Sequence, residues 1–112
     1  MFKGQIKLRE KYGHDCYYSF FYTPIEVEAF GASVIYSHNG PPNAGAPFLR
    51  KEMINDLKTP LVKESKILSK VLEATALLKE VARDEVPIIG VVVSPFSLPI
   101  MQMGFDKYIE LI

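Results

Sequence analysis

The sequence predicts an α/β fold in which parallel strands pack against at least one long amphipathic helix. Residues 65–83 repeat apolar side chains at helical spacing, and residues 88–93 follow as an apolar run without alternation. Such a run is typical of a strand that is buried on both faces of a parallel sheet. A second strand candidate, residues 16–22, comes earlier in the chain. The order strand, helix, buried strand is a βα pattern.

Composition restricts the function classes. The chain has 112 residues, of which 48% are apolar and 23% charged, so collagen, wholesale disorder and disulfide scaffolds are excluded. This length fits one domain and no second. Thirteen basic and thirteen acidic residues cancel, so we expect no nucleic-acid or membrane partner. A single cysteine, Cys16, excludes an internal disulfide and favours a cytoplasmic location.

No targeting or membrane segment is expected. Residues 1–11 mix charged and apolar side chains, without the apolar centre of a signal peptide. The longest apolar run has six residues, whereas a membrane helix needs roughly 20.

The N-terminal third alternates helix and strand signals. Residues 2–12 carry a loose helical pattern that Gly13 ends. Residues 16–22 are too aromatic for a solvated helix and predict a strand, which Pro24 closes. Residues 25–30 predict a short helical turn.

A loop excursion occupies about residues 37–63. It follows a short strand at 32–36 and begins with a block rich in glycine, proline and asparagine, residues 38–47, which predicts a loop. A short helix is expected at 51–57.

The strongest single element is the helix at 65–83. Its apolar stripe comprises Ile67, Val71, Ala74, Leu78 and Val81, with Leu68, Leu72 and Ala82 beside it.

The C-terminal part follows the buried strand. Pro87 prevents the helix from continuing into that strand, and residues 94–99 leave its C-terminal end as a loop. Asp106 is placed to cap a last helix, which contains Tyr108, Ile109 and Ile112.

Few side chains carry a local chemical signal. Cys16 fits either a small buried hydrophobe or a reactive thiol. His14 and His38 are too far apart for a zinc motif, so we expect no metal site in this chain. Glu26 and Glu28 could form an acid/base pair, although such pairs are more often solvated or tie down a loop.

Aromatic and hydroxyl side chains gather at two predicted strand ends. The sharpest feature is the segment 94–98, because residues that leave the C-terminal ends of strands build the sites of α/β folds. The aromatic group of the first strand suits either core packing or a flat-ligand pocket; it comprises Tyr17, Tyr18, Phe20, Phe21 and Tyr22.

Three stretches together resemble the uroporphyrinogen decarboxylase superfamily, which includes the methylcobalamin:coenzyme M methyltransferases and related corrinoid methyltransferases. The first resembles the first barrel strand and its glycine turn, the second the following loop and helix, and the third a later strand and loop. They are KYGHD (11–15) with EAFG (28–31); YSHNGPP (36–42) with LKTP (57–60) and VLEATALLKE (71–80); and VPIIG (86–90) with SPFSL (94–98).

The resemblance implies a (β/α)₈ TIM barrel, which needs roughly 250 residues. Residues 1–112 are therefore expected to form an N-terminal segment of such a barrel, a truncated family member that is inactive by itself. The decarboxylases bind porphyrin carboxylates through an arginine-rich loop that is not found here. Their carboxylate at the end of the first strand aligns with Tyr22. Both departures favour the methyltransferase branch.

That branch transfers a methyl group from a methylcobamide to a thiol. The resemblance implies corrinoid and zinc as cofactors of a full-length relative, with zinc ligands in its C-terminal half and none in this chain. The implied substrates are a small molecule or a corrinoid protein. Catalytic residues remain unknown, and the substrate- or corrinoid-facing candidates are Tyr22, Ser94, Phe96 and Ser97.

Two alternatives stay open: porphyrin decarboxylation, and a non-catalytic assembly or binding module. A small number of strands leaves unpaired edges and apolar faces, so we expect the chain to self-associate. The side chains expected to lack part of their cover are Val91, Val93, Ile109 and Ile112.

Overall fold

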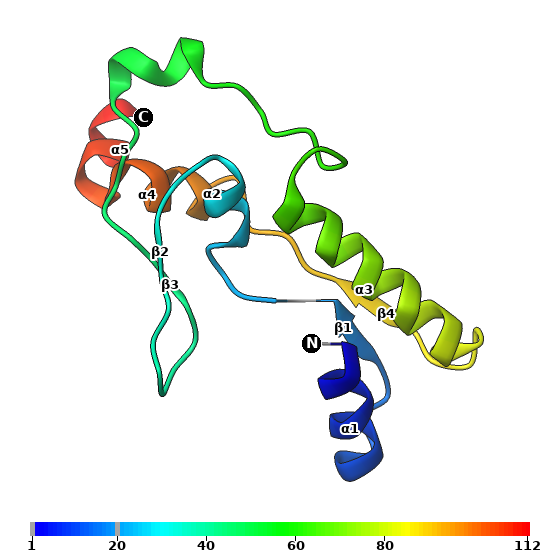
Figure 1. The fold of residues 1–112 in the computed structure, drawn as a ribbon. Coiled ribbons are helices and arrows are strands. Elements are labelled where there is room, and N and C mark those ends of the chain that lie inside the picture. The colour runs from blue at the N-terminus through cyan, green and yellow to red at the C-terminus, as the bar shows by residue number, and fades with distance from the viewer. Residues whose placement is uncertain (1, 20) are drawn as a thin grey trace.

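A long helix over a pair of parallel strands forms one half of the molecule (Figure 1). The computed structural model describes residues 2–19 and 21–112. We call this part the helix–sheet half; it comprises α1 (Phe2–Tyr12), β1 (Tyr17–Ser19), α3 (Lys66–Ala82) and β4 (Ile88–Gly90). Strands β1 and β4 pair in parallel, with Tyr17 opposite Ile88 and Ser19 opposite Gly90. The predicted parallel pairing, with the long helix packed on the sheet, is confirmed.

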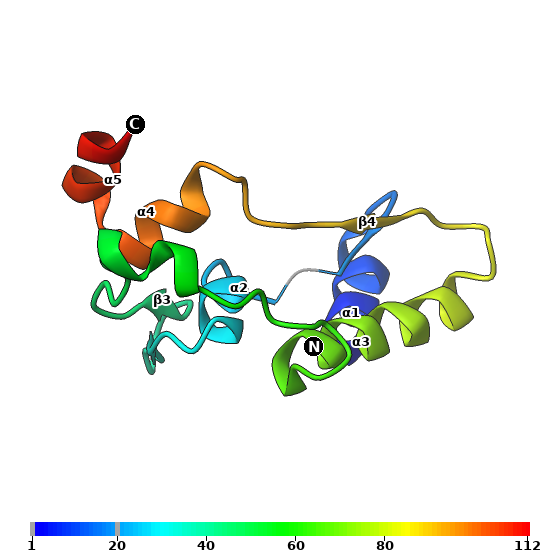
Figure 2. The same cartoon turned by 90° about the horizontal axis from the view of Figure 1, so that it is seen from above.

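The remaining elements form the hairpin half. They are α2 (Ile25–Ala29), β2 (Val34–Ile35), β3 (Asn43–Ala44), the 3-10 helix η1 (Lys51–Asp56), α4 (Ser97–Met103) and α5 (Phe105–Leu111). Figure 2 shows the two halves side by side, joined by extended segments. The radius of gyration is 16.3 Å, against about 13 Å for a compact domain of this length. The molecule is therefore elongated.

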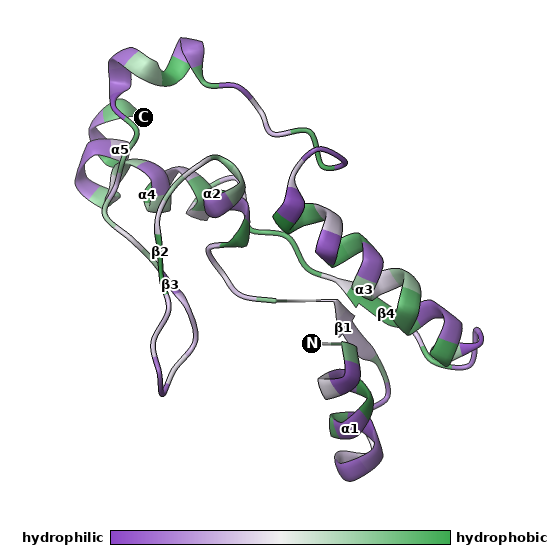
Figure 3. Ribbon diagram, viewed as in Figure 1, coloured by the Kyte–Doolittle hydropathy of each residue, from purple (hydrophilic) through white to green (hydrophobic). Residues whose placement is uncertain are grey.

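Helix α3 begins and ends where its sequence predicts. The Ser65 hydroxyl accepts a hydrogen bond from the Leu68 amide at 3.3 Å, and Arg83 ends the helix in the left-handed conformation. Ala74, Leu78 and Ala82 are buried, one helical turn apart. Figure 3 shows apolar and hydrophilic residues alternating around this helix.

The buried stripe of α3 is narrower than predicted. Val81 and Leu72, both expected to face the core, are 42% and 52% exposed. Among the described residues the sheet beneath α3 has two strands, so it covers only a narrow strip of the helix.

The prediction of a doubly buried strand at 88–93 is wrong in extent and in burial. Strand β4 ends at Gly90, Ile89 is 40% exposed and Val92 is 83% exposed. Within the described chain β4 pairs with β1 alone, and its main helix contact is with α3. One face of the strand is therefore left open to solvent.

The predicted aromatic strand is also shorter than expected. Its regular part is Tyr17–Ser19, whereas Phe21 and Tyr22 have left the sheet. Phe20, which belonged to that prediction, lies outside the described residues. In contrast, the predicted helix at 2–12 is confirmed, and Gly13 follows it with φ of 69°. The helical turn expected at 25–30 is confirmed as α2.

The loop predicted at 38–47 contains strand residues. Strand β3 pairs antiparallel with β2, with Val34 opposite Ala44 and Ile35 opposite Asn43. The Gly45 amide donates to the Ser33 carbonyl at 2.9 Å, which brings the two backbones together at the base of the hairpin. Residues 38–47 therefore contain a strand because they pair with the predicted strand at 32–36, although their composition indicates only turns. The helix expected at 51–57 is the 3-10 helix η1.

The C-terminal helices differ from prediction at their starts. Helix α4 begins at Ser97, within the predicted loop 94–99, and Gly104 separates it from α5 with φ of 89°. Asp106 lies in the first turn of α5, and the capping position belongs to Gly104. The Gln102 carbonyl accepts hydrogen bonds from the amides of Phe48 and Leu49, both at 2.9 Å. These bonds fasten the chain ahead of η1 to helix α4.

No helix in the described part of the chain is both long and apolar enough to cross a bilayer.

Candidate functional site

The C-terminal ends of β1 and β4 lie at the same end of the parallel pair and lead into the hairpin half. The chain leaves β1 towards α2, and it leaves β4 towards α4, which packs against α2. Glu26 of α2 joins the two paths, because its Oε1 accepts a hydrogen bond from the Val93 amide at 3.0 Å. The residues that follow both strands are therefore held together.

Tyr22, Glu28 and Tyr36 form a hydrogen-bonded cluster at this end. The Tyr22 hydroxyl donates to Glu28 Oε2. The Tyr36 hydroxyl lies 3.1 Å and 3.3 Å from the two Glu28 oxygens and 3.2 Å from the Tyr22 hydroxyl. The two rings meet edge to face, with centroids 6.0 Å apart. Tyr22 follows β1, Glu28 belongs to α2 and Tyr36 follows β2. Three separate segments thus meet at the Glu28 carboxylate.

The cluster holds the Tyr22 proton firmly. Burial, and after it the hydrogen bond to Glu28, raises the pKa of the Tyr22 phenol far above its ordinary value of 10.0. A group with such a pKa stays protonated and neutral near pH 7. Tyr22 is therefore a fixed dipole and a poor proton donor to a reacting atom.

A cavity of about 280 Å³ opens beside the cluster. One wall carries the two phenols and the Glu28 carboxylate, and helix α3 supplies the opposite wall with Ile67 and Lys70. Its full lining is Phe21, Tyr22, Ile25, Glu28, Tyr36, Ile67 and Lys70. Both phenol oxygens and the lysine ammonium can hydrogen-bond a small polar ligand.

The other candidates, Ser94, Phe96 and Ser97, make contacts of their own. Ser94 Oγ accepts from the Ser97 amide at 3.0 Å and also bonds Ser97 Oγ at 3.0 Å, so it fixes the turn that leads into α4. The Phe96 ring packs edge to face on Tyr108 with centroids 5.4 Å apart, and half of its surface is exposed. In the described part of the chain no hydrogen bond joins these three residues to Tyr22. Their substrate-facing role stays a prediction.

Tyr36 was not predicted as a site residue, and Glu28 was considered together with Glu26 and not with the two tyrosines. Tyr36 follows the short strand β2, eight residues from Glu28, and no local pattern links the two. Glu26 and Glu28, considered as an acid/base pair, bond different groups: Glu26 the Val93 amide, and Glu28 the two phenols. Residues two apart on a helix do not share a face, which explains the separation.

The described residues by themselves hold neither cofactor implied by the resemblance. Within residues 2–19 and 21–112, no three His, Cys, Asp or Glu side chains gather as metal ligands would. The cavity beside Tyr22 is smaller than the roughly 300–1,000 Å³ typical of drug-sized ligands, so it can contact only the edge of a corrinoid or porphyrin ring.

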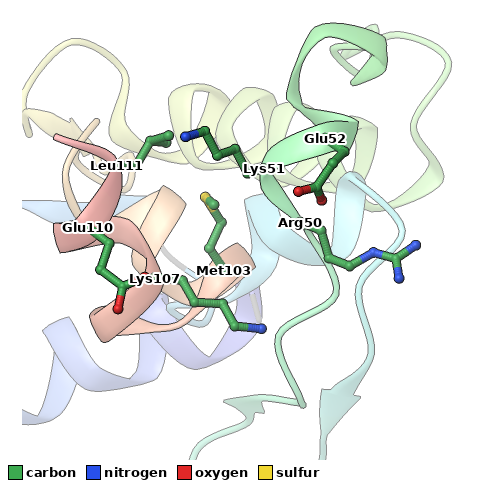
Figure 4. A pocket seen from close by; sticks show the side chains of 7 residues that line it. All are labelled: Arg50, Lys51, Glu52, Met103, Lys107, Glu110 and Leu111. Atoms are coloured by element: carbon green, nitrogen blue, oxygen red, sulfur yellow. The ribbon is translucent and has the colours of Figure 1, made fainter.

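A second pocket, of about 370 Å³, lies between η1 and α5 (Figure 4). Met103 lies near its centre, with Lys51 and Lys107 on either side. Arg50, Glu52 and Glu110 add charges of both signs, and Leu111 completes the lining. Mixed exposed charges without a shared partner do not define a ligand, so we place the candidate site at Tyr22.

The comparisons with known proteins give one match. The family model described as "Uroporphyrinogen decarboxylase (URO-D)" matches residues 1–112. Neither curated proteins nor solved structures yield a match.

Proposed function

The chain belongs to the uroporphyrinogen decarboxylase family, and from that premise we propose that its parent reaction is methyl transfer from a methylcobamide to a thiol. In this proposal residues 1–112 contribute two parallel strands and a connecting helix to a (β/α)₈ barrel. Tyr22 lies at the substrate-facing end of that barrel. The parallel β1–β4 pair with α3 packed on it supports this placement.

The identity and hydrogen bonding of Tyr22 carry the choice of reaction: the resemblance aligns this phenol with a carboxylate of the decarboxylases, and its hydroxyl donates to Glu28. Decarboxylation breaks a carbon–carbon bond, releases CO₂ and must then deliver a proton to the carbon left behind. A phenol with a strongly raised pKa delivers a proton poorly. Methyl transfer from a methylcobamide to a thiol would break the cobalt–carbon bond, leave its electron pair on cobalt, form a sulfur–carbon bond and release the thiol proton to solvent, so it needs no acid at this position. A neutral, hydrogen-bonded tyrosine suits the second reaction better.

In this proposal Tyr22, Glu28 and Tyr36 position the ligand and do not transfer a proton to it. Glu28 fixes the phenol orientation, and Tyr36 braces the same carboxylate. Both tyrosine side chains line a small cavity that Lys70 also borders. We expect the 112 residues alone to bind ligand without turnover, since among residues 2–19 and 21–112 no cluster of side chains could hold a thiol-activating metal ion.

The experiment compares ligands on the purified chain. Tyrosine fluorescence is followed during titration with methylcobalamin or with uroporphyrin, for wild type, Tyr22→Phe and Tyr22→Asp. We expect methylcobalamin to bind wild type more tightly than uroporphyrin does, and Tyr22→Asp to reduce that preference. Tighter uroporphyrin binding by wild type, or CO₂ release from uroporphyrinogen that Tyr22→Phe abolishes, would overturn the proposal in favour of decarboxylation.

A second candidate function, assembly with another copy of the chain, is favoured by exposed apolar side chains. Val91, Ile109 and Ile112 are 38%, 43% and 76% exposed, as predicted, and Val93 is half-buried. Sedimentation at several protein concentrations tests this candidate. A mass that rises with concentration supports assembly, and a monomer at all concentrations contradicts it.

A further inference from the structure

Asn39 and Gly40 lie in the connection between strands β2 and β3. Both residues are exposed, Asn39 is in a turn, and neither belongs to the paired part of the hairpin. Figure 1 shows the loop that joins the two strands pointing away from the helices. The reaction proposed for the Tyr22 cluster gives this loop no role, although an asparagine followed by glycine has a chemistry of its own.

That chemistry requires the backbone nitrogen of the following residue to reach the asparagine side chain. Glycine has no Cβ to block the approach, and its backbone is the least restricted of all residues. A paired strand or a helix holds the backbone in one conformation, whereas an exposed loop opens at little cost in free energy. Asn39 meets both conditions, because Gly40 follows it and the two residues lie in an exposed loop.

The two other asparagines of the chain do not meet these conditions. Asn43 lies in β3, opposite Ile35, and Ala44 follows it. Asn55 lies in the 3-10 helix η1, and Asp56 follows it. Both are exposed, so exposure does not distinguish the three asparagines. The local backbone and the next residue do.

We propose that Asn39 is a site of spontaneous deamidation in the folded protein. The Gly40 nitrogen attacks Asn39 Cγ, and the new N–Cγ bond closes a succinimide ring. The bond from Cγ to the side-chain nitrogen breaks, and ammonia leaves with the proton of the Gly40 amide. One water molecule then opens the ring and leaves aspartate or isoaspartate at position 39. Nothing is oxidised or reduced, and water is the only co-reactant.

Both products introduce a negative charge into a loop that has none. Residues 36–47 contain no acidic side chain, and the formal net charge of the chain changes from 0 to −1. Isoaspartate also adds one carbon atom to the main chain between β2 and β3. Tyr36, which bonds Glu28, lies in the same hairpin. The modification therefore alters the segment that carries Tyr36, and it does not depend on which reaction the parent enzyme performs.

The test incubates the full chain at mildly alkaline pH, both folded in buffer and unfolded in urea. Mass spectrometry follows the gain of about 1 Da for each event and locates it by peptide mapping. A carboxyl methyltransferase specific for isoaspartate detects the rearranged product. In the folded chain we expect Asn39 to convert about tenfold faster than Asn43 or Asn55, and within about threefold of its own rate in urea.

Two variants separate the effect of the next residue from that of the loop. Gly40→Ala retains Asn39, and its Cβ would lie 3.7 Å from the Ser37 hydroxyl oxygen, which is an ordinary contact. We expect it to slow conversion at Asn39 about tenfold or more. Ala44→Gly creates a second asparagine–glycine sequence, within β3. In that folded variant we expect Asn43 to convert about tenfold more slowly than Asn39, and at a similar rate in urea.

Three outcomes overturn the proposal: an Asn39 that converts in urea but not in the folded wild type, equal rates at Asn39 in wild type and Gly40→Ala, or equal rates at Asn39 and Asn43 in folded Ala44→Gly. Circular dichroism verifies that each variant is folded, and the wild-type comparison is decisive even where a variant fails to fold. None of these outcomes bears on corrinoid or porphyrin binding, which is measured separately.

Discussion

The helix–sheet half and the hairpin half are organised differently. In the first, Tyr17, Leu78 and Ala82 form an apolar core under one long helix, with α1 packed beside it. In the second, no helix exceeds seven residues among those described; its buried apolar side chains come from several short segments, and backbone hydrogen bonds at Ser33 and Gln102 join these segments. One half therefore packs around a single long helix, whereas the other combines scattered apolar contacts with backbone hydrogen bonds. The candidate site follows the strand ends, where the two halves meet.

The largest expected effect is in the helix–sheet half. Leu78 is 1% exposed, so Leu78→Ala leaves a cavity and should lower the free energy of unfolding by about 2–5 kcal/mol. Its neighbour Leu77 is 42% exposed, and Leu77→Ala should cost less than about 1 kcal/mol. Urea unfolding followed by circular dichroism measures both. Similar losses for the two variants would mean that apolar packing under α3 does not hold this half together.

Backbone geometry should respond next, in the hairpin half. A Cβ at Gly45 would lie 2.8 Å from the Ser33 carbonyl oxygen, so Gly45→Ala must push the two strands apart. We expect a loss of about 1–3 kcal/mol in unfolding free energy, as for other overpacked sites.

Gly4→Ala is the control for that substitution. No atom lies within 4 Å of a Cβ at Gly4, which is in helix α1, so alanine should stabilise the protein by about 0.5–1 kcal/mol. Thermal unfolding of both variants compares them. A neutral Gly45→Ala would show that the hairpin is not set by this close approach.

Helix caps offer a smaller test in each half. Ser65 caps the long helix α3 and is half-buried, whereas the Ser94 hydroxyl accepts the first amide of the short helix α4 and is exposed. Ser65→Ala should cost about 1 kcal/mol and Ser94→Ala about 0.5 kcal/mol. Chemical denaturation of the two single variants gives the difference. A larger loss from Ser94→Ala would indicate that Ser94 has a role beyond capping.

The smallest expected effect concerns Tyr22, which lies where the two halves meet, and it appears only at high pH. The pKa of Tyr22 is raised on folding, so this residue stabilises the folded state fully below pH 10. Above that pH the unfolded chain loses the phenol proton first, and the stabilisation declines as pH rises. The unfolding free energy of wild type should therefore fall more steeply above pH 10 than that of Tyr22→Phe. Parallel curves for the two proteins would show that Tyr22 titrates normally.

Elements governed by local sequence could be predicted, and those governed by partners could not. The helical spacing in α3, with Ser65 before it, predicted that helix almost to the residue. Burial depends on what lies opposite, so Val81 and Val92 are exposed although their pattern is apolar. Strand β3 has an unfavourable composition and exists through pairing with β2.

The same distinction holds at the candidate site. Tyr22 could be singled out from the resemblance, which aligns it with a carboxylate of the decarboxylases. Its bond to Tyr36 depends on how far the hairpin bends back, which no sequence spacing specifies. The hydrogen bond from the Val93 amide to Glu26 likewise depends on α2 lying against the end of β4.

The pairing of β1 with β4 sets the order of events during synthesis. The Ser19 hydroxyl donates to the carbonyl of Ile89, which lies 70 residues later in the sequence. The paired residues of β1 and β4 are separated by a similar number of residues. At 5–20 residues per second, a ribosome needs about 4–14 s to deliver the second strand after the first. Throughout that interval the aromatic strand β1 has an open edge, while α1 and the hairpin can already form from contiguous sequence. A chaperone that protects nascent chains would therefore find the edge of β1 exposed throughout this interval.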